Sequence, residues 1–237
     1  MSWALLGALV LVEIAYPLVP DRDPLVVATV LLGFALSVTH AWRTRGWRTA
    51  ALLVAVTTGG GFAVEALGVA TCVPFGCYGY SGALGPRPGG VSWVIPLAWT
   101  WMAWPAWLVA GRLVAGFLRV PLAGFGLAAW DVFLDPQMVA EGYWTWADPS
   151  PALPGVPGIP VGNYLGWLVV AVLMMAFLAR VPPTESDDRP MYALYLWTYA
   201  SSVLAHAVFL DLPGSALWGG VVMGLVAVPL GWRLWRS

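Results

Sequence analysis

The chain has 237 residues, of which 60% are hydrophobic and 10% are charged, and its formal net charge is -1. A mean hydropathy of +0.78 leaves too little polar surface to cover a soluble globule, so the composition excludes a soluble protein and indicates an integral membrane protein. Because the chain has no lysine and almost no net charge, no nucleic-acid partner is expected.

Apolar runs long enough to cross a hydrocarbon core of about 30 Å recur along the whole chain. They predict a single integral membrane domain, residues 1–237, built as an all-α polytopic transmembrane helical bundle. The fifth run is the weakest because it contains two aspartates, and seven spans result if that run is re-entrant or interfacial. The eight expected spans are residues 2–19, 25–42, 49–67, 92–115, 119–137, 163–180, 191–211 and 215–234.

The first run has neither a basic leader nor a small-residue cleavage site, so we expect it to be a retained span and not a signal peptide. Arginine placement predicts the orientation, since cytoplasmic links are enriched in Lys and Arg. Eight spans place nine of the eleven arginines on one side, in the second, fourth and sixth links and the C-terminal tail. Both termini are therefore predicted to be cytoplasmic, in a multi-pass protein of the cell membrane.

Four titratable residues lie inside apolar runs: Glu13, Glu65, Asp131 and His206. A charge at such a position is costly unless it is paired, neutral or next to a wet cavity. All four fall in the outer half of their spans. They therefore predict one shared polar pocket near the outer surface.

The two cysteines, Cys72 and Cys77, occur in "TCVPFGCYGY" on the outer side, directly after the third span. A disulfide across this turn is geometrically possible, and two small buried thiols are an equal alternative. No histidine is near them in the sequence, so a zinc site is not expected.

Tryptophans run down the fourth span in "WTWMAWPAW", which places Trp101 and Trp104 in its interior. Trp130 stands next to Asp131 in the following span. Tryptophan faces stabilise cations and stack on flat conjugated chains, although packing against lipid or other helices is the more common role for any single ring.

Asp131 and Asp135 form the pair of residues best suited to acid–base chemistry. Residues four apart share one face of a helix, so the two carboxyls would lie close together in a poorly solvated place. Both cannot easily ionise there, and the expected state is a protonated acid beside a carboxylate. Such a pair can act as a general acid and base. The alternative is structural, because Asp135 precedes Pro136 and can simply end the helix.

Several cofactor chemistries have no support in the sequence. The chain lacks a Gly-rich phosphate motif, a Walker lysine and any lysine that could hold retinal. No cofactor and no metal are therefore expected. The outer link "PSPALPGVPGIP" predicts a rigid, poorly hydrogen-bonded cover.

Four motifs occur in an order that resembles the membrane-integral carotenoid biosynthesis proteins, a group that includes carotenoid hydratases. The resemblance covers most of residues 60–170 and implies a carotenoid polyene as substrate, surrounding membrane lipid, and other carotenoid-pathway enzymes as candidate partners. The motifs are "EALGVATCVPFGCYGY" (65–80), "DVFLDP" (131–136), "GYWTW" (142–146) and "GIPVGNYLGW" (158–167).

Under this resemblance the expected activity is the addition of water across terminal isoprenyl double bonds. Protonation of the alkene gives a tertiary cation, which water captures. Asp131 or Asp135 is the expected acid, and the partner carboxylate or Glu65 holds the water. The residues expected to contact the substrate or the cation are Trp101, Trp104, Trp130, Trp144, Trp146, Tyr78, Tyr80, Asn163, Trp167 and His206.

Two other functions remain open from the residues themselves. A carotenoid cyclase or isomerase would share the protonation step but exclude water from the cation. A proton-coupled solute transporter also uses intramembrane acids, yet it needs them at several depths. Here the acids within the spans gather in the outer half, which favours a pocket over a path.

Overall fold

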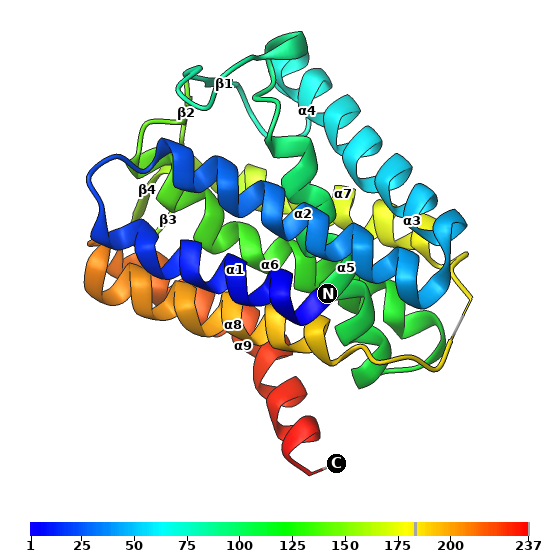
Figure 1. The fold of residues 1–237 in the computed structure, drawn as a ribbon. Coiled ribbons are helices and arrows are strands. Elements are labelled where there is room, and N and C mark those ends of the chain that lie inside the picture. The colour runs from blue at the N-terminus through cyan, green and yellow to red at the C-terminus, as the bar shows by residue number, and fades with distance from the viewer. Residues whose placement is uncertain (183, 237) are drawn as a thin grey trace.

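The computed structural model describes residues 1–182 and 184–236, and it is mostly helical (Figure 1). Each of the eight predicted runs forms one continuous helical segment within these residues. The third and seventh segments each contain a π-helical turn. The segments are α1 (Ser2–Ala15) with a 3-10 turn (Tyr16–Leu18), α2 (Asp23–Arg45), α3 (Trp47–Val54) continuing through Ala55–Gly59 into α4 (Gly60–Thr71), α5 (Ile95–Leu113), α6 (Arg119–Ala140), α7 (Val161–Leu178), α8 (Arg189–Leu204) with Ala205–Phe209, and α9 (Pro213–Trp235).

Five of these segments are long and apolar enough to cross a membrane, namely α2, α3–α4, α6, α7 and α9. The protein is thus a multi-pass membrane protein by the length and composition of its helices. The segment around α6, which the sequence marked as the weakest, is one of the five. Its continuous helix argues against the seven-span alternative. That α1, α5 and α8 also cross remains a prediction.

The links between helices gather at two opposite ends of the bundle. At one end Arg45 forms an ion pair with Asp188 of the link before α8, and Arg233 of α9 donates to the carbonyl of Arg112. At the other end Arg22 pairs with Glu141. The links therefore alternate between ends as eight antiparallel segments require. The side of the membrane on which each end lies stays a prediction.

Four short strands lie in the links at the end of the bundle that carries Arg22 and Glu141, and they correct the all-α expectation (Figure 1). β1 (Tyr78–Tyr80) pairs antiparallel with β2 (Trp144–Trp146), and β3 (Ala152–Leu153) pairs with β4 (Val156–Pro160). In "YGY" and "WTW" large rings alternate with small residues, so one face of each strand can carry only aromatic rings. The link 149–160, predicted to be poorly hydrogen-bonded, contains the β3–β4 hairpin instead.

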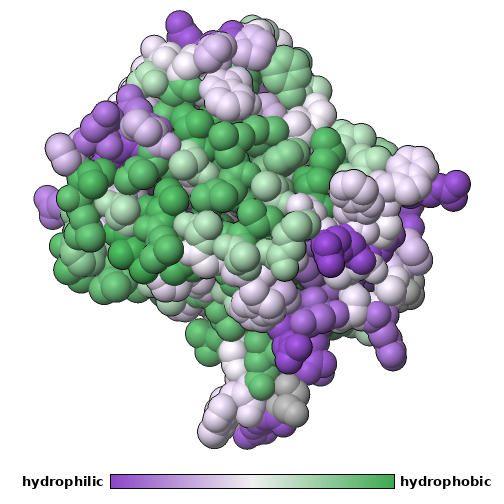
Figure 2. Space-filling view, in the orientation of Figure 1, coloured by the Kyte–Doolittle hydropathy of each residue, from purple (hydrophilic) through white to green (hydrophobic). Residues whose placement is uncertain are grey.

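Helix α5 forms the centre of the bundle and is buried along most of its length. The helices packed around it expose their large apolar side chains on their outer faces. Figure 2 shows apolar residues across the middle of the face that carries α1 and α2, with hydrophilic residues to either side. This band is the surface expected to meet lipid.

Candidate functional site

Helix α6 presents Asp131 and Asp135 on one buried face, as their spacing predicts. The two side chains are 0% and 3% exposed. The amide of Asn163, in the first turn of α7, donates to Oδ2 of Asp131 at 3.0 Å and also to Oδ2 of Asp135. One nitrogen therefore holds both carboxyl groups. Trp144 of β2 donates its indole hydrogen to Oδ1 of Asp135 at 3.0 Å.

Glu65 lies on a face of α4 that is otherwise lined by glycine. Gly61 and Gly68 are buried one turn before and nearly one turn after it. A Cβ atom at either position would stand 2.9 Å from the side chain of Trp99 or Tyr78. These two glycines let the rings approach the helix, so that the rings reach the glutamate between them.

Three donors hold the Glu65 carboxylate, which is 3% exposed. Tyr80 donates at 2.8 Å and Trp99 at 3.1 Å, and Tyr78 donates to the same oxygen as Tyr80. Burial and the nearby charge of Glu65 raise the pKa of Tyr78 and the pKa of Tyr80 above the ordinary tyrosine range. Both phenols therefore stay protonated and remain donors.

Aromatic rings enclose these carboxyl groups. Trp99 of α5 and Trp167 of α7 are stacked, with centroids 3.8 Å apart. Tyr78 stacks on Trp146 at 5.6 Å across the β1–β2 pair. Tyr80 meets Trp144 edge to face at 5.5 Å. The small sheet thus closes the site on the side away from the helices.

Glu65, Asp135 and Asn163 line one cavity of about 20 Å³. A single ordered water needs roughly 10 to 15 Å³ of such space, so the cavity is of the size of one water. Asp131 lies behind Asp135 and is joined to it through Asn163; its Oδ1 atom is buried without a hydrogen-bond partner among the described residues.

A much larger cavity, of about 400 Å³, lies between α1, α2, α5, α6 and α8. Trp101 and Trp130 line it and meet edge to face at 5.1 Å. Ile95 and Leu134 line both cavities and stand between them. Trp101 and Trp130 are therefore neighbours of the carboxyl site and not part of its wall.

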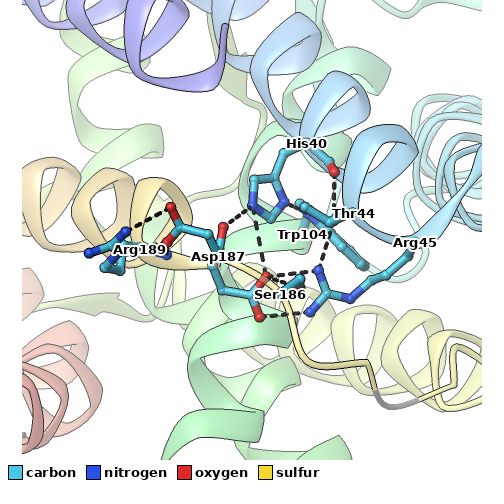
Figure 3. Close-up of polar contacts among 8 residues, drawn as sticks. His40, Thr44, Arg45, Trp104, Ser186, Asp187 and Arg189 are labelled. Carbon is cyan, nitrogen blue, oxygen red and sulfur yellow. Dashed lines mark hydrogen bonds and ion pairs between the residues drawn. The ribbon is translucent and has the colours of Figure 1, made fainter.

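Figure 3 shows Trp104 beside His40 and Arg45, and Trp104 does not line the cavity of the carboxyl groups. Its indole donates to Nδ1 of His40 at 3.0 Å, and Nε2 of His40 is 3.0 Å from the carbonyl oxygen of Asp187. The guanidinium of Arg45 lies over the Trp104 ring at 5.2 Å. This cluster joins α2 and α5 to the link before α8, so Trp104 cannot form the wall expected from the sequence.

His206, in the π-helical turn after α8, is also apart from the carboxyl groups. Its ring nitrogens lie 2.9 Å from the hydroxyl of Ser215 and 3.3 Å from the amide oxygen of Gln137. It packs edge to face on Phe133. These contacts join α6, α8 and α9 beside the large cavity. The one pocket predicted for Glu13, Glu65, Asp131 and His206 does not form, because Glu13 lines the large cavity and only Glu65 and Asp131 lie at the carboxyl site.

Trp99 was not among the residues predicted for the site, although it donates to Glu65. The signal that could have identified it is the glycine at position 61, which leaves room for a ring against α4. Phe75 was also missed; it packs near Trp167 and accepts a hydrogen bond from Trp146 through its carbonyl oxygen.

A disulfide joins Cys72 and Cys77, which decides between the two alternatives that the sequence left open. It closes the loop between α4 and β1. Glu65 lies before this loop and its donors Tyr78 and Tyr80 lie after it. The disulfide therefore shortens the covalent path between the acceptor Glu65 and its donors Tyr78 and Tyr80.

The sequence model of the family described as "Carotenoid biosynthesis protein" matches residues 25–232. The bisanhydrobacterioruberin hydratase of Haloarcula japonica is 29% identical over 187 residues. That alignment covers 73% of this chain and 61% of the relative, so the chain spans less than two thirds of the relative's length. No solved structure matches the chain. Because the family match extends over most of its length, the chain belongs to the carotenoid biosynthesis protein family.

Proposed function

We propose that this protein is a carotenoid hydratase, which adds water across a terminal isoprenyl double bond of a long acyclic polyene. Bisanhydrobacterioruberin, named in the relative's activity, is the candidate type of substrate. One observation carries the proposal: Glu65 and Asp135 line the same cavity, which is of the size of one water and is enclosed by aromatic rings. An acid, a base and a place for water thus meet beside an apolar cavity.

Asp135 is the proposed proton donor, because it faces the cavity whereas Asp131 lies behind it. Two carboxyls held by one amide repel each other when both are ionised, so the pair favours sharing one proton. Asp135 would transfer this proton to the less substituted carbon of the double bond. Asp135 is left as a carboxylate, and the more substituted carbon becomes a tertiary cation.

Glu65 is the proposed base. Its carboxylate can accept a hydrogen bond from the water, orient the oxygen toward the cation and take one proton as the new C–O bond forms. The product is a tertiary alcohol. Return of the proton from Glu65 to Asp135 restores the starting state, with no net change in the protein.

The aromatic wall supports the cation. Ring faces attract positive charge, and the attraction increases when water is excluded. Trp144 and Trp167 line the small cavity together with Tyr78, Tyr80 and Trp146. The hydrogen bonds of Trp144 and Asn163 to Asp135 also hold the donor in one orientation, which general acid catalysis requires.

The site is proposed to face the outer side of the membrane. Its end of the bundle carries the Cys72–Cys77 disulfide, and disulfides persist in oxidising compartments. The arginine-rich links lie at the other end, as the enrichment of Arg in cytoplasmic links predicts.

Incubation of the purified protein with an acyclic polyene in ¹⁸O-labelled water tests this function. Mass spectrometry should show that each reacted end gains one labelled water. A product of unchanged mass but altered chromatographic retention would indicate cyclisation or isomerisation instead. Recovery of unchanged polyene, from protein shown to be folded, would contradict the proposal.

A further inference from the structure

The large cavity contains a carboxyl group that the proposed reaction does not use. Glu13 of α1 lines this cavity and accepts a hydrogen bond from the indole of Trp197 on α8 through Oε2. Its other oxygen, Oε1, has no hydrogen-bond partner among the described residues, and none of the ion pairs found there includes Glu13. A carboxyl oxygen in an apolar cavity favours a ligand that can donate a hydrogen bond.

The cavity opens toward the surface that meets lipid. Leu18 and Leu204 line it and are 66% and 56% exposed. Ile14 and Phe209 line it as well and are also exposed. These residues come from α1 and α8 with their adjoining turns, and the two helices lie side by side (Figure 1). An apolar molecule dissolved in the membrane can therefore enter sideways between them.

The cavity also adjoins the carboxyl site, because Ile95 and Leu134 line both spaces. A volume of about 400 Å³ is within the range of pockets that enclose a drug-sized molecule. A long polyene exceeds that size, so only one end segment fits and the remainder stays in lipid. Most of the lining is apolar; besides Glu13, its polar side chains are those of Tyr16, Thr29, Gln137, Thr198, Ser201 and Ser202.

We propose that the large cavity binds an isoprenoid chain that carries a hydroxyl group, which enters from the lipid between α1 and α8 and donates a hydrogen bond to Glu13. This inference rests on the proposed function for the isoprenoid class of the ligand. It assigns Glu13 to recognition and leaves the proton transfer to Asp135. The enzyme would then select a polyene that is already oxygenated near the end to be hydrated.

Binding can be measured without turnover by using two acyclic polyenes whose terminal double bonds are saturated. One carries a tertiary hydroxyl group and the other is the matched hydrocarbon. Quenching of tryptophan fluorescence in detergent gives the Kd of each. The wild-type protein should bind the alcohol about tenfold more tightly, the difference expected for one hydrogen bond to a carboxylate. Equal affinities for the two polyenes would overturn the proposal.

Glu13→Leu should abolish the preference for the alcohol and leave the affinity for the hydrocarbon unchanged, which also shows that the variant is folded. Glu13→Gln retains an acceptor oxygen and should keep a reduced preference. If Glu13→Leu does not bind the hydrocarbon, the test rests on Glu13→Gln. A full wild-type preference of Glu13→Gln for the alcohol would contradict a role for the carboxylate.

The entry route has its own matched pair of variants. Ala200 lines the cavity and is exposed, whereas Ala207 is exposed but outside the cavity. Ala200→Phe should weaken binding of both polyenes about tenfold or more, and Ala207→Phe should not. Equal binding by both variants would exclude this route. None of these measurements depends on hydration, so the cavity can be confirmed or refuted even if the labelled-water experiment fails.

Discussion

Replacement of Asn163 by leucine tests how the two aspartates are held. The asparagine donates to Asp131 at 3.0 Å and to Asp135, and all three side chains are buried. Leucine has a similar size and no donor, so it removes both hydrogen bonds while filling the same space. A hydrogen bond to a charged group contributes about 1.5 to 3 kcal/mol. Loss of one such bond from the reacting state corresponds to a rate decrease of roughly 10- to 150-fold.

We therefore expect Asn163→Leu to slow hydration about a hundredfold, because the proton donor Asp135 loses its orientation and Asp131 loses its hydrogen-bond donor. The assay is the initial rate of hydrated polyene formation by purified protein in detergent, followed by chromatography. Tyr164→Phe is the matched control on the same helix. The Tyr164 hydroxyl is buried without a partner among the described residues, so its removal should change the rate less than threefold.

A wild-type hydration rate for Asn163→Leu would refute the reasoning, because the reaction would then not need the amide that donates to both aspartates. Equal losses in Asn163→Leu and Tyr164→Phe would show that general packing near α7, and not the amide, sets the rate. Thermal unfolding of each variant in detergent separates a lost rate from a lost fold.

Three further predictions concern regions outside the carboxyl pair. Trp104→Phe should lower the melting temperature but keep the hydration rate within about threefold of wild type, since only the hydrogen bond to His40, away from the site, is lost. A hundredfold lower hydration rate would show that Trp104 acts in the site. The Cys72→Ala, Cys77→Ala double variant should be less stable yet measurably active, and complete inactivity of folded protein would assign the cysteines a chemical role. An impermeant thiol reagent on intact cells should label an introduced Ser150→Cys but not Ser186→Cys, and the reverse pattern would invert the orientation.

The sequence predicted the helices well because each apolar run is long enough to be distinguished from its links. It also predicted that Asp131 and Asp135 share a face, which requires only the helical period. The family motifs placed Asn163 and Trp144 near that face, and the structure shows both bonded to Asp135. These features depend on local periodicity or on motifs, and both can be read from a single chain.

The direction of each ring on α5 could not be predicted. This helix is apolar on all sides and buried on all sides, so no polar face fixes its rotation. Trp99 and Trp101 are two residues apart, which turns them about 200° from each other around the axis. One therefore meets Glu65 while the other faces the large cavity, and Trp104 lies farther along near His40.

The β1–β2 pair was missed for a different reason. Tyr78 pairs with Trp146 across more than sixty residues of intervening chain. Strands of three residues have too little alternation to indicate a partner. Only tertiary packing brings these links together, and with them the donors to Glu65 and Asp135.

The most direct test of the account compares the hydration rates of Asp135→Asn and Asp148→Asn with the wild type. Asparagine keeps the size of the side chain but cannot deliver the proton, and loss of a general acid costs typically 10²- to 10⁴-fold. Asp148 is exposed in the link before β3 and caps only a local turn. We predict that Asp135→Asn hydrates the polyene at least about a hundredfold more slowly than the wild type, so that unhydrated polyene accumulates. Asp148→Asn should hydrate it at the wild-type rate. Hydration by Asp135→Asn at the wild-type rate would contradict the assignment of the proton donor.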